Sequence, residues 1–464
     1  MTLLLRGGPI RTMDPARPLA RSLVLDGERI VAVDSEPAGA EVLELDGRCV
    51  LPGFTDSHVH FPTWALTRRE LQLHGSREDV LAAVAAAVPD VPAGRWLRGF
   101  GWMADGWQPS RSALDAVSGD VPVALLAHDW HSLWVNSAAL AQARGNVEVP
   151  GGVVDLEAGV LREEAAWAFR DRYTLATHAE LVDATRAALP VAAARGVTAI
   201  HDKDGLIGSR EVFAELGDEL PFRVWQSLPA DRLDEGPDYV KVYMDGTLGS
   251  QTARLLDGTG VQITSRAQFE EIVRAATRAG VPVAVHAIGD LANREALDAF
   301  AAVPEAIRPR IEHAQCLHRD DIPRFAQLGV TASIQPSMAV TDAPVAERLW
   351  ADRLDGAYAY RSLHATGARL ALGSDAPVEE MDPLRGLRDA VLRDWRPHEA
   401  LDVQAALEAL TVTPAWLAGD GDRRGRLKPG MLADLVILDR DPVSDLAEAK
   451  VVDTYVAGRS TVNP

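Results

Sequence analysis

The 464-residue chain has only two cysteines, Cys49 and Cys316, which are too few for a disulfide framework. It has no apolar run of about 18 residues, so the sequence predicts no membrane-spanning helix. Its first residues lack the basic region and the apolar stretch that together typify a signal peptide. We therefore expect a cytoplasmic protein.

Basic residues are also scarce relative to acidic ones. The chain carries 47 lysines and arginines against 67 aspartates and glutamates, a net charge of −20. This balance argues against nucleic acid or an anionic membrane as the main partner, but it permits a small-molecule substrate. The hydrophobic and charged fractions, 47% and 25%, are those of an ordinary globular protein. The oligomeric state stays open, with a homodimer among the alternatives.

Both ends of the chain are rich in short strand-like runs. In residues 1–52, alternating or apolar segments are broken by Asp26-Gly27 and Asp46-Gly47, which are typical turn sequences. Residues 420–464 have the same character. This pattern predicts that the two termini meet in one small β-sandwich domain.

The middle of the chain, residues 53–419, alternates short apolar strands with helical stretches, a pattern typical of a parallel sheet. One strand ends at His60. Seven others are expected at 196–202, 222–227, 239–245, 281–286, 310–313, 330–335 and 369–375. Eight parallel strands with intervening helices predict an α/β fold of the (β/α)8, or TIM, barrel type.

The segment between the first two barrel strands is far too long for one crossover. We interpret residues 64–185 as an insertion that contains seven of the eleven tryptophans, Trp102 among them. Loops at the carboxyl end of barrel strands build substrate pockets, so these side chains are candidates to wall an apolar pocket. The alternative is that they pack the insertion's own core.

The stretch Leu51 to His60 leads an apolar run into His58-Val59-His60. Residues i and i+2 of a strand point to the same face, so both imidazoles can approach one divalent metal. Taken alone, the motif fits two surface histidines near a turn equally well.

Four more candidate ligands come from other barrel strands, namely Lys241, His286, His313 and Asp375. Each has a simpler interpretation: a surface cation for Lys241, core residues for the histidines, and a helix cap for Asp375. Strand ends of a barrel converge on one mouth, however, and four histidines with a carboxylate suit zinc or a similar divalent ion.

With these motifs, the chain resembles the amidohydrolase superfamily. Within it, the chain is similar to the amidohydrolase family 3 branch, which includes N-substituted formamide deformylases. The matching stretches span almost the whole chain and are residues 52–60, 131–140, 159–163, 241–250, 285–290, 312–313, 373–377 and 425–434.

The resemblance implies a role for each ligand. His58 and His60 would hold the more buried metal, and His286 and His313 a second one. A Lys241 carboxylated by carbon dioxide would bridge both ions, because a carbamate is an anionic oxygen donor whereas an ammonium repels metals. Asp375 would ligate a metal and act as general base and acid while a metal-activated hydroxide attacks a C–N amide-type bond.

Weaker candidates complete the predicted site. Trp102, His131 and Gln335 are candidates to face the substrate, and Glu163 is a substitute metal ligand should Lys241 stay uncarboxylated, although a helix-start residue explains it as well. Two other functions remain open: a mononuclear deaminase of the same superfamily, which the presence of Lys241 opposes, and a non-catalytic scaffold, which the complete ligand set opposes.

Overall fold

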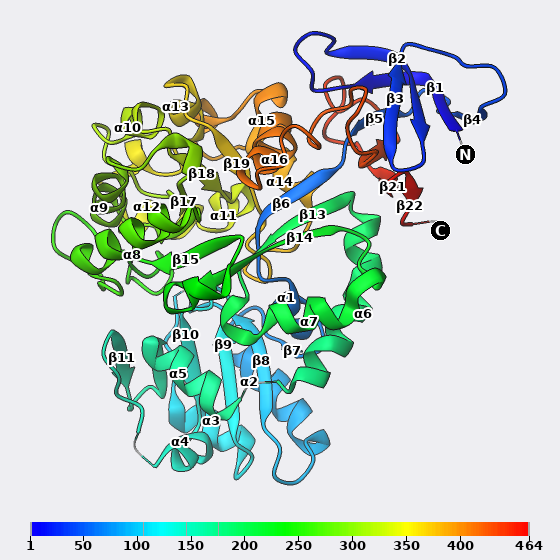
Figure 1. Cartoon of the computed structure of the whole chain (residues 1–464). Coiled ribbons are helices and arrows are strands. Elements are labelled where there is room, and N and C mark those ends of the chain that lie inside the picture. The colour runs from blue at the N-terminus through cyan, green and yellow to red at the C-terminus, as the bar shows by residue number, and fades with distance from the viewer. Residues whose placement is uncertain (1, 105, 145, 175, 463–464) are drawn as a thin grey trace.

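The computed structural model describes residues 2–462 except 105, 145 and 175, and its centre is a parallel barrel (Figure 1). The strands follow one another around the sheet in chain order. They are β6 (Phe54–Val59), β13 (Val197–Asp202), β14 (Arg223–Pro229), β15 (Tyr239–Tyr243), β16 (Val283–Ala287), β17 (Arg310–His313), β18 (Thr331–Ile334) and β19 (Leu370–Leu372). The predicted (β/α)8 barrel is confirmed.

The barrel closes where its first and last strands meet. Val59 forms a parallel bridge with Ala376 just beyond β19, and the His60 N–H donates to the Ala376 carbonyl at 2.8 Å. The Ser57 hydroxyl donates to the carbonyl of Leu372. Closure leaves no exposed strand edge at this seam.

Helices cover the outside of the barrel. They are α1 (Phe61–Thr67), α6 (His178–Ala194), α7 (Ser209–Leu216), α8 (Arg266–Ala279), α9 (Asp290–Phe300), α10 (Ile322–Gln327), α11 (Pro336–Thr341), α12 (Ala343–Leu349), α13 (Tyr360–Ala365), α14 (Pro383–Val391), α15 (Val403–Leu410) and α16 (Val412–Leu417). Local sequence sets where they begin: Thr177 with Glu180, and Ser265 with Gln268, form reciprocal capping boxes at α6 and α8. Short apolar strands such as β16 are buried along their whole length beneath these helices.

The two termini build one sheet, as predicted. Its strands are β1 (Thr2–Arg11), β2 (Leu19–Asp26), β3 (Arg29–Val33), β4 (Glu41–Glu44), β5 (Cys49–Pro52), β20 (Leu435–Leu438), β21 (Val451–Val456) and β22 (Arg459–Ser460). β5 pairs with both β1 and β20, which joins the ends of the chain around their own apolar core. Only Gly53 separates β5 from β6, so this domain is continuous with the first barrel strand.

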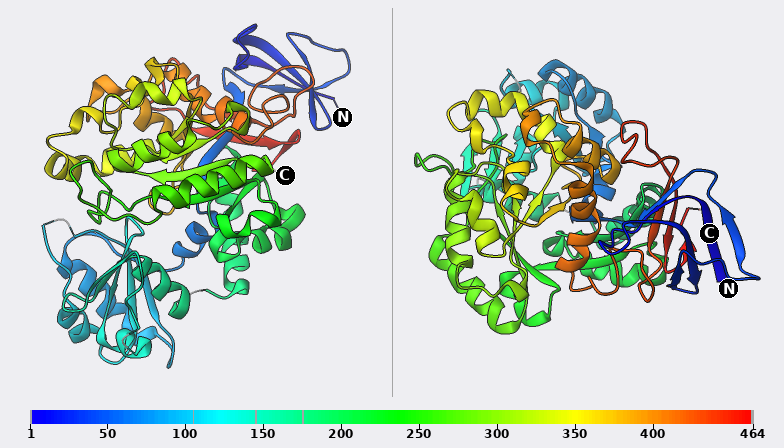
Figure 2. Two further views of the ribbon diagram at one scale, coloured as in Figure 1. Left: turned by 60° about the vertical axis from the view of Figure 1, so that its left-hand side comes forward. Right: turned by 90° about the horizontal axis from the view of Figure 1, so that it is seen from above.

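Most of the predicted insertion forms a second sheet with its own helices. The strands are β7 (Leu71–Gln72), β8 (Leu97–Trp102), β9 (Val123–Ala127), β10 (Ser132–Val135), β11 (Gly152–Asp155) and β12 (Val160–Glu163), and the helices are α2 (Arg77–Ala87), α3 (Arg111–Ser118), α4 (Ser137–Ala143) and α5 (Glu164–Tyr173). Figures 1 and 2 show this unit and the terminal β domain on opposite sides of the barrel.

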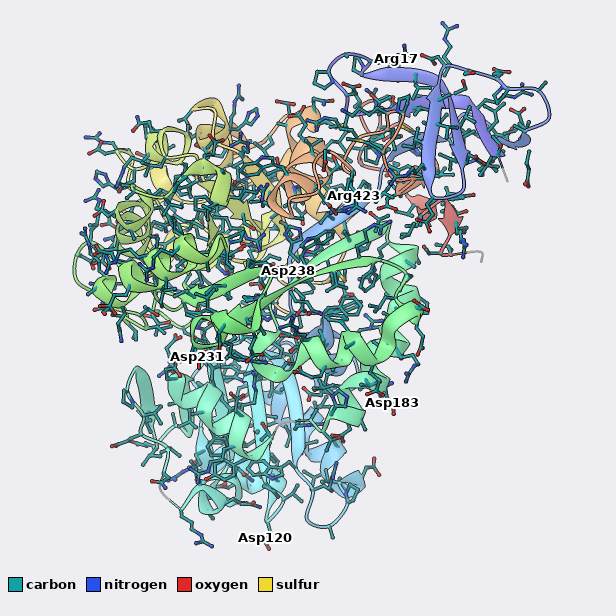
Figure 3. The ribbon with its side chains drawn as sticks, viewed as in Figure 1. Arg17, Asp120, Asp183, Asp231, Asp238 and Arg423 are labelled. Atoms are coloured by element: carbon teal, nitrogen blue, oxygen red, sulfur yellow. The ribbon has the colours of Figure 1, made fainter. Side chains whose placement is uncertain are left out.

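Exposed acidic side chains lie on both the insertion and the barrel. Figure 3 shows Asp120 at the far tip of the insertion, Asp183 on α6 and Asp231 beside the barrel strands, all exposed.

Among the described residues, no helix is long and apolar enough to cross a membrane.

Candidate metal centre

The end of β6 brings His58 and His60 to one side of the barrel mouth. Asp375 reaches the same point from the loop after β19, since its backbone N–H donates to the His58 carbonyl at 2.7 Å. Its Oδ1 lies 3.1 Å from His58 Nε2 and 3.5 Å from His60 Nε2. One potential ligand atom from each of the three residues lies within 4.8 Å of the others, a separation that a metal ion can bridge.

The other three predicted ligands come from the next strands around the mouth. Lys241 lies on β15, His286 on β16 and His313 at the end of β17. The His286 and His313 ring centroids are 4.4 Å apart, and the His313 ring is 4.9 Å from that of His58. All six predicted ligands line one cavity of about 400 Å³. The structure therefore brings the whole predicted set together.

Carboxylates and a carbonyl orient three of the four imidazoles. His58 Nδ1 lies 2.8 Å from Glu312 Oε2, and His60 Nδ1 lies 2.8 Å from Asp204 Oδ1. His286 Nε2 lies 3.1 Å from the Gly246 carbonyl oxygen. Each contact fixes one ring nitrogen as a proton donor and leaves the other free, which is how metal-ligating histidines are commonly held. The sequence motifs gave no signal for Glu312 or Asp204 in this role.

Glu312 is the centre of a buried charge network inside the barrel. Besides His58 it accepts from Lys203 Nζ at 2.9 Å and lies 3.0 Å from Arg310 Nε. Burial alone would raise the pKa of Glu312, but Lys203 and Arg310 hold it well below its usual range. The carboxylate is therefore ionised at neutral pH and holds the His58 Nδ1 proton in place.

We predict that Glu312→Gln destabilises both the fold and the metal centre. The neutral amide leaves Lys203 and Arg310 as buried cations without a counter-charge, which costs about 3 kcal/mol of unfolding free energy. Metal affinity falls by about tenfold or more because His58 loses its anchor. Chemical denaturation and elemental analysis measure the two effects. Glu235→Gln, at an exposed ion pair with Arg232, should change neither, and unaltered stability in Glu312→Gln would contradict the prediction.

Three of the candidate ligand atoms have no hydrogen-bond partner among the described residues, which is expected of atoms that bind a metal ion. Within the described part of the chain, His58 Nε2, His313 Nδ1 and Lys241 Nζ are buried without a hydrogen bond. Leaving a buried polar atom unpaired costs about 1–3 kcal/mol, so such atoms call for a ligand. The two imidazoles and the Asp375 carboxylate suit zinc or a similar divalent cation. His58, His313 and His60 hold the pKa of Asp375 well below its usual range, against the effect of its burial, so this ligand is an anion.

The substrate candidates fall in three different places. His131 lines the cavity, and its Nδ1 lies 2.6 Å from Glu163 Oε2. Gln335 is buried behind His58, with its Nε2 3.3 Å from His58 Nδ1, and is not part of the cavity wall. Trp102 lies in the insertion core, where its indole N–H donates to the Leu125 carbonyl at 2.8 Å. The expectations that Gln335 and Trp102 face the substrate are therefore corrected.

The tryptophan-rich insertion supplies less of the pocket than its sequence suggests. Trp130 and Trp167 line the cavity, whereas Trp102, Trp107 and Trp134 pack against one another beneath the second sheet. The sequence could not distinguish the tryptophans of the cavity wall from those of the insertion core, because the large rings fit both environments.

Glu163 is paired with His131 instead of with the metal ligands. It is fully buried at the end of β12, in a left-handed backbone conformation with φ of 53°. A Cβ at Gly246 would lie 2.3 Å from Glu163 Oε1, so glycine is required there. Glu163 raises the pKa of His131 against the effect of burial. Non-glycine residues at positive φ also include His313 (74°) and Asp375 (57°), so backbone strain gathers at this site.

A closed barrel with histidines, a lysine and an aspartate at the carboxyl ends of its strands defines the architecture of a metal-dependent hydrolase. The profile of the Amidohydrolase family matches residues 41–462, and the chain belongs to that family.

Two relatives and one solved structure illustrate the similarity. The chain is 32% identical to Protein LONG AFTER FAR-RED 3 of Arabidopsis thaliana, over 98% of this chain and 91% of the relative. It is 26% identical to the N-substituted formamide deformylase of Arthrobacter pascens, over 98% and 97%. An uncharacterized metal-dependent hydrolase from Pyrococcus furiosus superposes with a TM-score of 0.75 at 28% identity, covering 96% of this chain and all of that one.

Proposed function

We propose that the protein hydrolyses a C–N amide-type bond of a small molecule, using two divalent metal ions bridged by a carboxylated Lys241. The observation that carries this proposal is the convergence of six potential ligands on one cavity, with three of their donor atoms buried and lacking partners within the described chain. The similarity to an N-substituted formamide deformylase supports an amide, and a formamide in particular, as the substrate.

The residues of the chain have separate roles in this proposal. His58 and His60 would hold one metal and His286 and His313 the other. A metal at this position supplies a water of lowered pKa and polarises a carbonyl group. Asp375, whose carboxylate lies beside His58 and His60, would accept a proton from the attacking water and donate it to the leaving nitrogen. Trp130 and Trp167 exclude water from part of the cavity.

Lys241 has the environment that carboxylation requires. Only a neutral amine adds to carbon dioxide, and burial lowers the pKa of Lys241 from 10.5 to about 8. At neutral pH about one lysine in ten would therefore be uncharged, against far fewer than one in a thousand at the ordinary pKa. The resulting carbamate would place an anion where an ammonium would repel the metals.

We predict a pH dependence for this reaction. When metal-free protein is given zinc and a fixed concentration of dissolved ¹³C-labelled carbon dioxide, the rate of carbamate formation should rise about tenfold per pH unit below 8 and level off above it. The carbon-13 NMR signal of the carbamate follows the reaction independently of activity. A signal of equal size in Lys241→Ala would contradict the assignment.

Metal analysis combined with a substrate panel tests the proposed function. Protein purified without chelator should hold about two divalent metals per chain and hydrolyse N-alkylformamides, and removal of the metal should abolish the activity. About one metal, with activity on aminated heterocycles instead of amides, would favour the deaminase. Protein without metal that stays inactive after zinc and bicarbonate are added would be a scaffold.

A further inference from the structure

The cavity outside the predicted ligands is strongly acidic. Apart from Asp375 and Asp204, which belong to the metal centre, five carboxylates line it: Asp129, Glu164, Asp171, Asp342 and Glu379. The described lysine and arginine side chains that line it, apart from Lys241, are Lys203, which is paired with Glu312 at 2.9 Å, and Arg170, whose guanidinium lies over the Trp130 ring, 5.2 Å from the centroid. This distribution disfavours a substrate carboxylate.

Three of these residues and one amide line the same cavity, and we name them together the acceptor wall: Asp129, Gln315, Asp342 and Glu379. Asp342 accepts from the Tyr358 hydroxyl through Oδ2 alone, and Glu379, only 5% exposed, accepts from the Thr341 hydroxyl. All three carboxylates line the cavity, and Asp342 interacts electrostatically with both Asp129 and Glu379, so they lie near one another.

Asp129 contributes charge to the wall, but three hydrogen bonds already occupy most of its acceptor positions. It already accepts from the hydroxyls of Thr247 at 2.8 Å and Ser250 at 2.6 Å, and from the His131 N–H at 3.1 Å. These bonds tie the insertion to the loop after β15. Asp342, which accepts one side-chain hydrogen bond, keeps the most acceptor capacity for a ligand, whereas Glu379 accepts from both Thr341 and Arg385 and adds mainly charge.

Gln315 is an independent indication of a ligand at the acceptor wall. It is 3% exposed and lines the cavity, and its amide nitrogen lies 3.3 Å from Met338 Sδ. Sulfur accepts weakly, so this orientation leaves the amide oxygen directed elsewhere. Oε1 is buried with no hydrogen-bond partner anywhere in the described chain. A buried acceptor without a partner needs a hydrogen-bond donor. The carboxylates that line the same cavity are acceptors and cannot supply one.

We propose that the acceptor wall binds a cationic, hydrogen-bond-donating group of the substrate, such as a primary ammonium, at the end remote from the bond that is cleaved. The proposal rests on the proposed hydrolytic function and specifies its substrate class. The ammonium has three donors and no acceptor, which matches Asp342, Glu379 and the Gln315 oxygen.

Nearby cations do not cancel the charge of the wall. Arg385 lies 3.1 Å from Glu379 Oε2 but is 41% exposed, and His128 Nε2 lies 3.8 Å from Glu379 Oε1. Both offset charge on Glu379, and His128 also interacts electrostatically with Asp342, so two cations face the three carboxylates of the wall. Burial raises the pKa of Asp342 to about 6, so it is ionised above neutral pH.

The test compares two probes of equal length, hexylammonium and 1-hexanol, by calorimetry on the metal-containing protein at pH 8. The wild type should bind the ammonium at least about tenfold more tightly than the alcohol. Asp342→Asn should reduce this preference to about twofold or less, because the amide keeps the shape and loses the charge. Gln315→Leu should weaken ammonium binding alone and provides a second variant should Asp342→Asn fold poorly.

Asp171→Asn is the matched control. It also removes one carboxylate from the cavity rim, but its side chain is 48% exposed and lies outside the acceptor wall. It should leave the preference for the ammonium unchanged. Equal binding of the two probes by the wild type, or equal effects of Asp342→Asn and Asp171→Asn, would overturn the proposal.

Hydrolysis of a second pair separates this proposal from the proposed function. N-(5-aminopentyl)formamide and N-hexylformamide differ only in the charged end. Hydrolysis of the neutral compound without any preference for the charged one would refute the acceptor wall and leave the amidohydrolase assignment intact. Selective ammonium binding without hydrolysis of either compound would support the wall and refute formamide hydrolysis.

Discussion

Asp375→Asn should lower kcat for amide hydrolysis by about 10³-fold, because asparagine has no basic oxygen to accept a proton from water. The backbone contact between Asp375 and His58 does not involve the side chain, so the barrel seam should stay closed. Steady-state kinetics measure the loss, and elemental analysis shows whether metal is lost with it.

The comparison variant for this prediction is Asp171→Asn, which changes a rim carboxylate of the same cavity and should retain activity on a neutral amide within about twofold, as expected for an exposed charge. A variant of Asp375 that keeps activity would exclude it as the proton carrier. If the variant loses metal and activity in parallel, the main role of Asp375 is to bind the metal, and its role as proton carrier is secondary.

Lys241→Ala should lower the bound metal from about two per chain to one or fewer and reduce activity by about 10³-fold, because two cations would face each other without a bridging anion. Adding propionate should restore part of the bound metal and part of the activity, since a small carboxylate can occupy the space of the lost carbamate. Metal content by elemental analysis is the primary measurement.

Lys450→Ala, at an exposed position in the terminal β domain, serves as the control and should retain full metal and activity. If Lys241→Ala keeps its metal and its activity, the bridge does not exist. The centre would then be mononuclear, and the deaminase alternative would gain weight.

The six candidate ligands could be grouped from the sequence because each lies on or just after a barrel strand, and strand ends of a barrel meet at one mouth. His286 follows an apolar run that is recognisable without the structure, and His58 and His313 lie at or next to the ends of short strands in the same alternating pattern. The same argument applies to Asp375, which follows β19 by a few residues. Strand pattern was therefore enough to group these residues, whereas the role of each in metal binding came from the family resemblance.

The supporting charges could not be predicted in this way. Lys203 and Glu312 are fully buried, yet in sequence they resemble ordinary surface residues, because charged side chains are rarely inside unless they are paired. Glu163 likewise follows an unremarkable strand, and only the fold shows that it meets His131. Partners of this kind lie more than 30 residues apart in the chain, beyond the reach of local pattern.

The closure of the barrel at β6 also constrains how the protein is made. His58 and His60 leave the ribosome early, but Asp375 is added more than 300 residues later. A nascent chain that ends before β19 therefore has both histidines but not the carboxylate beside them. Capture of the proposed metals by the full ligand set would therefore follow synthesis past residue 375 and would report closure of the barrel.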